Sequence, residues 1–234
     1  MYGQRTWGTF SIVACDADRE YWGAAVSTKP LAVGAVVPWA EWRVGAVATQ
    51  AMSNIRYGPQ GLALLRKGVS APDVVRRLTS ADPKRDHRQL GVVDRKGRSA
   101  AWTGTKCMAS ARHVLGEGYS CQGNLLASDQ VVPAMAATFE ATRGSLARRM
   151  LAALHAGAAE GGDRRGMESA ALIVVHHRPW FERAWGDQWI NLRVDQSRRP
   201  VDELERIVRL EEVNARKLVA WHAAQLRKRR GRRR

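Results

Sequence analysis

Residues 7–16 of the chain, WGTFSIVACD, place a Gly-Thr pair directly before a run of β-branched and apolar side chains. This composition predicts a β-strand from Thr9 to Asp16. A turn-like Asp-Ala-Asp-Arg stretch ends the run, and a second apolar run, YWGAAVSTK, occupies residues 21–29. The two runs predict a pair of antiparallel strands, the first of which begins directly after a glycine.

Two more strand-like runs follow, LAVGAVVPWA at residues 31–40 and WRVGAVATQA at residues 42–51. Gly34 and Gly45 lie in their interiors, where a missing side chain lets a neighbouring layer come close. These runs predict a sheet that is tightly packed on both faces.

Two consecutive helices are expected next. The first, YGPQGLALLRKG at residues 57–68, has a proline near its start and a glycine at its end. The second, SAPDVVRRLTSAD at residues 70–82, begins with Ser70 and Asp73 at the spacing of a capping box.

Strand texture returns at residues 88–104, as two runs joined by a turn at Arg95-Lys96-Gly97, and at residues 118–124. Two helices follow, from about Ser128 to Thr142 and from Ser145 to Ala156, each opened by a serine cap and closed by Gly144 or Gly157. Strands are then expected at residues 168–177 and 188–195, and a long amphipathic helix runs from about residue 200 into the basic end.

Strands and helices thus arrive in blocks instead of alternating one by one. This order favours antiparallel sheets faced by helix layers over a doubly wound parallel fold. We expect an α+β protein with one globular domain at residues 9–226, which includes the long C-terminal helix. Residues 1–8 are expected to form a leader that cleavage can remove, and residues 227–234, RKRRGRRR, a disordered basic tail.

The composition is that of a soluble globular protein, with 45% hydrophobic and 26% charged residues among 234. No apolar run is long enough to span a membrane, and the opening MYGQRTWG lacks the apolar segment of a secretory signal. The three cysteines, Cys15, Cys107 and Cys121, show no CxxC spacing. We expect a cytoplasmic protein with reduced cysteines and no membrane partner.

The net charge of +16 has two interpretations. Much of it lies in the C-terminal RKRRGRRR, and a block of like charges is usually a solvated end. The alternative is a non-specific contact with phosphates, which would weaken strongly with salt. The solvated end is favoured, so no nucleic-acid partner is expected beyond contact with this tail.

Thr9 carries a hydroxyl at the first position of the first strand. A threonine hydroxyl becomes a nucleophile when a base takes its proton, and the free α-amine of the same residue does so when threonine is the first residue. That amine has a pKa of about 8, so it is partly unprotonated at neutral pH. The Gly8-Thr9 bond would then be a processing junction. The alternative is a plain β-branched strand residue, which the dipeptide alone favours.

Several short motifs occur together in one order, and they bear on this choice. They are TFSIVACD, GAAVSTKPLAVGAVVPWA, VGAVATQAMSNIRYGPQGL, RQLGVVDRKG, AAWTGTKC, CQGNLLASDQVV, GGDRRGMESAALIVV and INLRVDQSRRPVDEL. The chain resembles, from about Thr9 to Leu210, the family catalogued as domain of unknown function 1028, which is placed in the N-terminal-nucleophile (Ntn) hydrolase superfamily.

This resemblance implies a four-layer αββα sandwich, in which two antiparallel sheets pack face to face between helix layers. It also implies that Thr9 is a nucleophile exposed by cleavage after Gly8, as in proteasome-like relatives. The hydroxyl would attack an amide carbonyl, form an ester and release it to water. No methionine lies between Met1 and Thr9, so the free amine requires cleavage of a peptide bond.

The resemblance also suggests catalytic residues at the end of the second strand. Ser27 occupies the place where proteasome-like enzymes keep an Asp, and Lys29 could lower the pKa of the nucleophile by its charge. The alternative for Lys29 is an exposed side chain at a strand end. The third strand, GAVVPWA, lacks the lysine of the proteasome-type mechanism.

Four residues are candidates for an oxyanion hole or for substrate binding. The backbone amides near Thr49 and Gln50, with the side chain of Asn54, could hold developing negative charge, or this stretch is a strand-to-helix turn with a capping residue. Asn124 is a second amide donor, or part of an ordinary Gly-Asn turn.

The loop GGDRRG combines glycines, a carboxylate and two guanidinium groups. Asp163 and Arg164 are therefore candidates for holding a substrate carboxylate through a bidentate arginine. The favoured alternative is a loop held together by an internal pair of Asp163 with Arg164 or Arg165.

We predict no metal site, because His176 and His177 lie on opposite faces of a predicted strand and lack partners at a ligand spacing. No cofactor is expected. Three hypotheses follow: an amidohydrolase for a small amide or peptide-like substrate, a catalytically silent binding protein of the same fold, and nucleic-acid binding through the arginine-rich end. The tryptophans near apolar runs belong either to the core or to a subunit contact, since aromatic residues favour both, and we expect a homodimer.

Overall fold

In the computed structural model, the chain is described over residues 8–18, 20–177 and 188–231. One group of strands comprises β1 (Thr9–Asp16), β2 (Tyr21–Thr28), β7 (Arg112–Gly116), β8 (Tyr119–Asn124), β9 (Ser169–Val175) and β10 (Gln188–Val194). A second group comprises β3 (Pro38–Glu41), β4 (Gly45–Ala51), β5 (Arg88–Asp94) and β6 (Ser99–Thr103). The α-helices of the described residues are α1 (Tyr57–Arg66), α2 (Ala71–Ser80), α3 (Val131–Ala141), α4 (Leu146–Ala159) and α5 (Pro200–Gly231).

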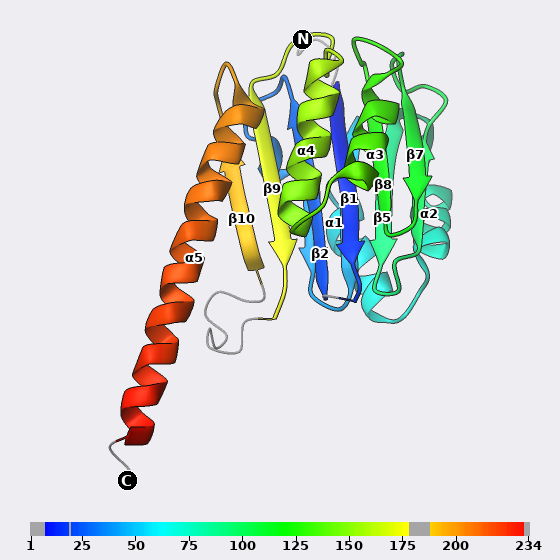
Figure 1. Ribbon diagram of the computed structural model, residues 1–234. Helices are drawn as coiled ribbons and strands as arrows, with labels where there is room; N and C mark the ends of the chain where they lie inside the picture. The colour runs from blue at the N-terminus through cyan, green and yellow to red at the C-terminus, as the bar shows by residue number, and fades with distance from the viewer. Residues whose placement is uncertain (1–7, 19, 178–187, 232–234) are drawn as a thin grey trace.

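The strands form two antiparallel sheets (Figure 1). The six-stranded sheet has the order β10-β9-β2-β1-β8-β7, and the four-stranded sheet has the order β3-β4-β5-β6. The expectation of a mixed α+β protein with antiparallel sheets is confirmed. The strand β1 lies between β2 and β8, so its first residue has a strand on either side.

Small and branched side chains fill the space between the two sheets. One buried cluster joins Val13 and Val26 of the six-stranded sheet to Ala46, Ala48 and Val93 of the four-stranded sheet. Such small side chains allow the two sheets to approach closely while excluding water.

The helices bury the other faces of the sheets. Phe10 and Leu172 pack in one cluster with Met135, Leu154 and Leu204 from α3, α4 and α5. A separate cluster packs α1 and α2 against β4 and β5, and it contains Val47, Leu62, Leu65, Val75 and Leu90. In Figure 1, α3 and α4 lie in front of the six-stranded sheet.

The alternation of β1 explains why this short stretch organises both layers. Phe10 and Ile12 belong to the cluster with the helices, whereas Val13 belongs to the cluster between the sheets. Successive side chains of a strand point to opposite faces, and every residue from Thr9 to Cys15 is buried.

The predicted serine caps are right at two helices and wrong at one. Ser70 accepts a hydrogen bond from the Asp73 amide and Ser145 accepts one from the Arg148 amide, each at 3.3 Å. Ser128 does not cap α3, because this helix begins at Val131 with Gln130 at the cap position.

Gly157 is also not a helix end, since α4 continues to Ala159. A Cβ at this glycine would lie 2.9 Å from Met135 Cγ and 3.1 Å from Phe10 Cδ2. Gly157 is therefore a point of close packing of α4 against α3 and β1, and not the predicted helix end.

Two strand predictions also need correction. Residues 31–37 are not a strand: they contain a short 3-10 helix, Val33–Ala35, and pairing begins only at Pro38. A Cβ at Gly34 would lie 2.7 Å from Ala171 Cβ, so this glycine permits the turn to pack on β9. The sequence of the edge strand β7, RHVLG, does not alternate between apolar and polar residues and contains no buried residue, so the sequence does not predict this strand.

His176 and His177 follow the end of β9 at Val175 and do not form the predicted strand end. Their rings stack on Tyr21 and Trp42, with centroid distances of 4.0 and 4.7 Å. His176 therefore packs at the start of β2, and His177 packs on the turn between β3 and β4.

The helix α5 extends beyond the body of the protein (Figure 1). Val201, Leu204 and Val208 are buried, whereas Leu210 and Trp221 are 52% and 57% exposed. The helix continues to Gly231, so residues 227–231 are helical where a disordered tail was expected, and residues 232–234 lie outside the described part. No helix in the described ranges is both long enough and apolar enough to cross a membrane.

Candidate active site

The strand register brings three polar residues together at the start of β1. Thr9 pairs with Thr28 of β2 on one side and with Asn124 of β8 on the other. Directly paired residues on neighbouring strands share a face of the sheet, and all three are at most 3% exposed. The Thr9 hydroxyl lies 3.2 Å from the Thr28 hydroxyl.

The carbonyl oxygen of Gly8 is the point on which several donors converge. It accepts hydrogen bonds from Thr9 Oγ1 at 2.5 Å, from Arg165 Nη2 at 3.1 Å and from Thr28 Oγ1. Two hydroxyls and one guanidinium therefore surround the carbonyl of the peptide bond that precedes Thr9. This is the arrangement that stabilises negative charge on a carbonyl oxygen.

Asp163 lies beside this carbonyl with its side chain fully buried. Its carboxylate accepts hydrogen bonds from the backbone amides of Lys29 and Arg165, each at 3.0 Å. The Arg165 side chain adds two charge-assisted bonds, from Nε at 3.0 Å and from Nη2 at 2.7 Å. The Thr28 hydroxyl is 3.4 Å from Asp163 Oδ2.

The loop between α4 and β9 can hold Asp163 and Arg165 in this place because of its glycines. Gly161, Gly162 and Gly166 have φ values of +98°, +55° and +90°, in the left-handed region that glycine adopts readily. The expected internal pair of this loop is present, with Arg165 as the partner of Asp163. Arg164 turns away and donates to the Leu126 carbonyl at 3.2 Å.

Gln50 reaches the site from the second sheet. Its side-chain nitrogen lies 3.3 Å from the Thr9 carbonyl oxygen and 2.7 Å from Gln89 Oε1, and its oxygen accepts a bond from Ser11 at 2.6 Å. Asn124 donates to Gln89 Oε1 at 3.1 Å. Gln50 and Asn124 thus belong to a buried amide network behind Thr9, which fixes the strand and does not contact the Gly8 carbonyl.

The other predicted residues have different surroundings. Ser27 pairs with Phe10, hence faces the helices, and donates to the Ser169 carbonyl at 3.0 Å. Lys29 contributes its backbone amide to Asp163, but its ammonium forms an ion pair with Glu168 and is 41% exposed. The structure therefore brings the backbone of Lys29 to the site and leaves Ser27 on the opposite face of β2.

Thr49 and Asn54 lie in a separate hydrogen-bonded turn. The Thr49 hydroxyl donates to the Asn54 carbonyl at 3.2 Å, and the Asn54 side chain donates to Asp82 at 3.2 Å. Burial alone would raise the pKa of Asp82, but hydrogen bonds from Lys84, Tyr57, Asn54 and Arg88 outweigh it and lower the pKa to about 2. This cluster has the character of a structural anchor for the turn.

Thr28 and Arg165 are the two site residues that the sequence-based reasoning did not single out as functional. A signal for Thr28 was available: the short connection between β1 and β2 sets a register that pairs Asp16 with Tyr21 and therefore Thr9 with Thr28. The choice between two adjacent arginines depends on the loop geometry, for which the pattern GGDRRG carries no signal.

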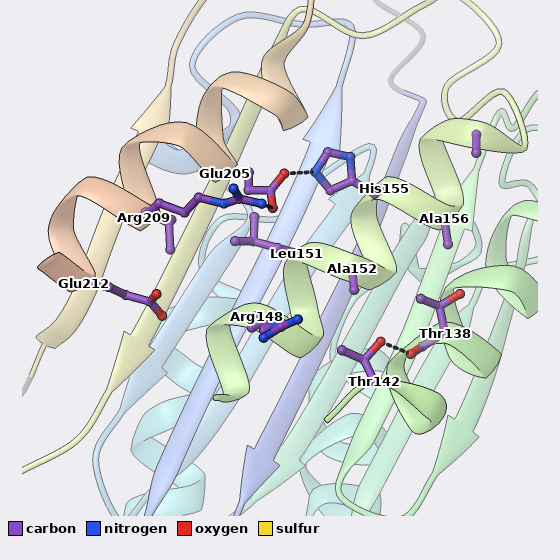
Figure 2. Close-up of a pocket in the computed structure, with 12 residues that line it drawn as sticks. Thr138, Thr142, Arg148, Leu151, Ala152, His155, Ala156, Glu205, Arg209 and Glu212 are labelled. Carbon is purple, nitrogen blue, oxygen red and sulfur yellow. Dashed lines mark hydrogen bonds and ion pairs between the residues drawn. The ribbon is translucent and has the colours of Figure 1, made fainter. Parts of the chain in front are cut away.

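A hollow of about 820 Å³ lies apart from these residues, among α3, α4 and α5 (Figure 2). His155 approaches Glu205 at 3.0 Å and Arg209 approaches the same carboxylate at 2.6 Å. Burial raises the pKa of Glu205, but the Arg209 hydrogen bond and the His155 charge lower it further than burial raises it. None of the residues around the Gly8 carbonyl lines this hollow. Within the described ranges, no group of three or more His, Cys, Asp or Glu side chains is placed to hold a metal ion.

Comparisons with known proteins agree on one family. The model of the family of unknown function DUF1028 matches residues 9–204. The crystal structure of a DUF1028 protein from Silicibacter pomeroyi is 33% identical, with a TM-score of 0.77 over 86% of this chain and 88% of that one. No curated protein matches the chain.

Proposed function

The chain belongs to the DUF1028 family of unknown function, and from this premise we propose that it is a self-processing amidohydrolase of the N-terminal-nucleophile type. Thr9 is the proposed nucleophile, and the bond between Gly8 and Thr9 is its first substrate. The proposed substrate class is a small amide or peptide-like C–N bond, and no cofactor is required.

The single observation that carries the proposal is the surroundings of the Gly8 carbonyl oxygen. The Thr9 hydroxyl, the Thr28 hydroxyl and the Arg165 guanidinium all donate to it. An ordinary strand entry needs one hydrogen-bond partner for such a carbonyl. Three donors, one of them cationic, instead favour charge development on this oxygen.

The first chemical step would be a transfer of the Gly8 acyl group from nitrogen to oxygen. Thr9 Oγ1 forms a bond to the Gly8 carbonyl carbon, and the carbonyl oxygen becomes negative between Thr28 and Arg165. Thr28 gives its own proton to Asp163, 3.4 Å away, and takes the Thr9 proton, which it then donates to the oxyanion; Arg165 holds the oxyanion during this transfer. The C–N bond then breaks, the proton ends on the Thr9 nitrogen, and an ester remains.

Water completes the processing by hydrolysing that ester. Residues 1–8 leave as a carboxylic acid, and Thr9 regains its hydroxyl proton and now carries a free α-amine. This amine replaces the Thr28 and Asp163 relay as the base for later substrates. A substrate amide is attacked in the same way, with its nitrogen leaving as an amine and its acyl group leaving as an acid.

The fold supports the proposal at a coarser level. Helices pack on the outer face of each sheet, and the sheets pack on each other. We infer from these contacts a four-layer αββα sandwich of the Ntn type. In that architecture the start of β1 is the expected place of the nucleophile.

The proposal is tested by the intact mass of the purified full-length protein and of three variants. Wild-type protein is expected to lose residues 1–8. Thr9→Ser keeps a hydroxyl and should still be cleaved, whereas Thr9→Ala and Thr9→Val should keep the leader. The free-amine mechanism would be excluded if every wild-type molecule kept its leader after prolonged incubation of a folded sample.

One observation favours a second candidate, a silent binding protein with its leader in place. Thr9 is only 3% exposed and its hydroxyl is occupied by the Gly8 carbonyl, so the uncleaved chain offers no accessible nucleophile. This alternative predicts that wild-type protein and Thr9→Ala both keep residues 1–8 and that neither hydrolyses an amide substrate.

A further inference from the structure

We infer that the acyl side of the cleaved bond must lack a side chain, so that the substrates of the mature protein are glycyl amides. This inference rests on the proposed function and narrows its substrate class. It follows from the space around Gly8 and from the way in which Asp163 is held.

A side chain at position 8 has no room in the structure. A Cβ built on Gly8 would lie 2.7 Å from Asp163 Oδ1, 2.9 Å from its Cγ and 3.0 Å from its Oδ2. Carbon atoms do not approach a carboxylate so closely, because repulsion rises steeply below van der Waals contact. The flat face of the Asp163 carboxylate therefore forms one wall of the acyl position.

Asp163 cannot move aside to admit a larger group. Both of its oxygens are held by backbone amides and by the Arg165 guanidinium. Turning the carboxylate would leave a fully buried charge without these partners, which is strongly unfavourable. The same contacts keep Arg165 in reach of the Gly8 carbonyl, so the wall and the carbonyl-binding group form one rigid unit.

The restriction carries over from self-cleavage to substrates because both reactions form the same kind of ester. During processing, the Gly8 acyl group becomes bonded to Thr9 Oγ1. During hydrolysis of an added amide, the substrate acyl group becomes bonded to the same oxygen as the amine leaves. Its α-carbon then faces the same wall, so a glycyl group fits and an L-alanyl group collides with Asp163.

The first experiment compares leader removal in the full-length wild-type chain, in Gly8→Ala and in Gly3→Ala. Gly3→Ala makes the same chemical change elsewhere in the leader and serves as the matched control. The fraction cleaved is followed by intact-mass spectrometry, and thermal melting reports folding of each variant. Gly8→Ala is expected to be cleaved about 100-fold more slowly than wild type, and Gly3→Ala at the wild-type rate.

The second experiment does not depend on the folding of any variant. Self-processed wild-type protein is given the aminomethylcoumarin amides of N-acetylglycine and N-acetyl-L-alanine. The glycyl probe is expected to react with a kcat/KM about 100-fold higher than the alanyl probe.

The outcomes separate this inference from the function on which it rests. Rapid cleavage of both wild type and Gly8→Ala, or equal hydrolysis of the two probes, would overturn the glycyl restriction and leave the hydrolase intact. A folded wild-type chain that never loses its leader would overturn both. If wild type loses its leader and a folded Gly8→Ala variant keeps it, the glycyl restriction is supported. This holds even where neither probe is hydrolysed because both are too small to bind.

Discussion

The Thr28 hydroxyl connects the two parts of the site. It donates to the Gly8 carbonyl and lies within 3.4 Å of Asp163 Oδ2 and 3.2 Å of the Thr9 hydroxyl. A hydroxyl can accept one proton while donating another. Thr28 is therefore placed to bind the developing oxyanion and to transfer the Thr9 proton.

A hydroxyl deletion at this residue tests that role. Thr28→Val keeps the β-branched shape and removes the donor, so we expect the leader to be removed about 100-fold more slowly, as for other oxyanion-hole donors. The matched control is Ser27→Ala, because Ser27 lies next in the chain but faces the helices. A time course of intact mass measures both variants. Wild-type speed for Thr28→Val would exclude its hydroxyl from the step.

Single site residues could be predicted from the sequence where the chemistry requires a particular residue type. They could not be predicted where the three-dimensional structure determines which of two adjacent residues faces the site. The Gly8-Thr9 pair and the carboxylate of Asp163 could be proposed from residue type and the family pattern. The choice of Thr28 over Ser27 depends on strand register, because adjacent residues face opposite layers. The choice of Arg165 over Arg164 depends on the path of a glycine-rich loop.

Among the elements, the turn after α2 is held by one buried carboxylate. Asp82 accepts hydrogen bonds from Tyr57 of α1 at 2.9 Å, from Arg88 of β5 at 3.0 Å and from the Lys84 amide at 2.8 Å. It thereby ties two helices to the four-stranded sheet. Burial of Asp82 opposes its ionisation, but these donors prevail and lower its pKa from 3.8 to about 2.

This pKa shift predicts how stability depends on pH. Because the folded pKa lies below the unfolded one, the carboxylate stabilises the fold above pH of about 4, and this contribution is lost as the pH falls through about 2. Asp82→Asn should therefore lower the free energy of unfolding by about 2 kcal/mol at pH 7. Urea unfolding at pH 7 and pH 3 should show the gap to wild type narrowing.

The control for this change is Asp129→Asn. The Asp129 side chain is 61% exposed, and its carboxylate forms an ion pair with Arg112 at 3.4 Å. An exposed ion pair contributes little, so a change below about 1 kcal/mol is expected. A gap for Asp82→Asn that stays constant between pH 7 and pH 3 would mean that the carboxylate charge does not supply the stability.

Elements were predictable from the sequence where their apolar pattern is strong. The buried strands β1, β5 and β9 and the capped helices α2 and α4 carry such patterns. The edge strand β7 has one sheet partner, and its sequence RHVLG lacks an apolar pattern. The apolar residues 31–37 form a turn, because packing on β9 and the 3-10 helix prevails over their strand propensity.

For the whole molecule, the interface between the sheets has an apolar part and a polar part. Val13, Val26 and Val93 belong to the apolar part, whereas Ser11, Gln50 and Gln122 form a fully buried hydrogen-bonded layer nearer to Thr9. Buried amides that are all satisfied restrict how two layers can slide. The polar layer thus fixes the position of Thr9 relative to the second sheet. Hydrogen bonds between side chains of two different sheets cannot be predicted from the order of residues along the chain.

The C-terminal half of α5 projects beyond the body of the protein (Figure 1). The buried contacts of this helix include Val208 but not Leu210 or Val213, which are 52% and 48% exposed. Glu212 still reaches Ser145 at 3.4 Å. Deletion of residues 213–234 keeps that contact and every residue around Gly8, while it removes nine basic and no acidic side chains.

This truncation should leave the free energy of unfolding within about 0.5 kcal/mol of wild type, because little apolar surface is re-exposed. Leader removal should proceed at the full-length rate, since the site lies between residues 8 and 165. Retention on a polyanion such as heparin should fall and depend less steeply on salt, because nine fewer cationic side chains can contact the polyanion. Urea unfolding, intact mass and salt-gradient elution measure the three effects. A loss of more than about 2 kcal/mol together with a smaller particle in size-exclusion chromatography would instead assign the end of α5 to a contact between two copies of the chain.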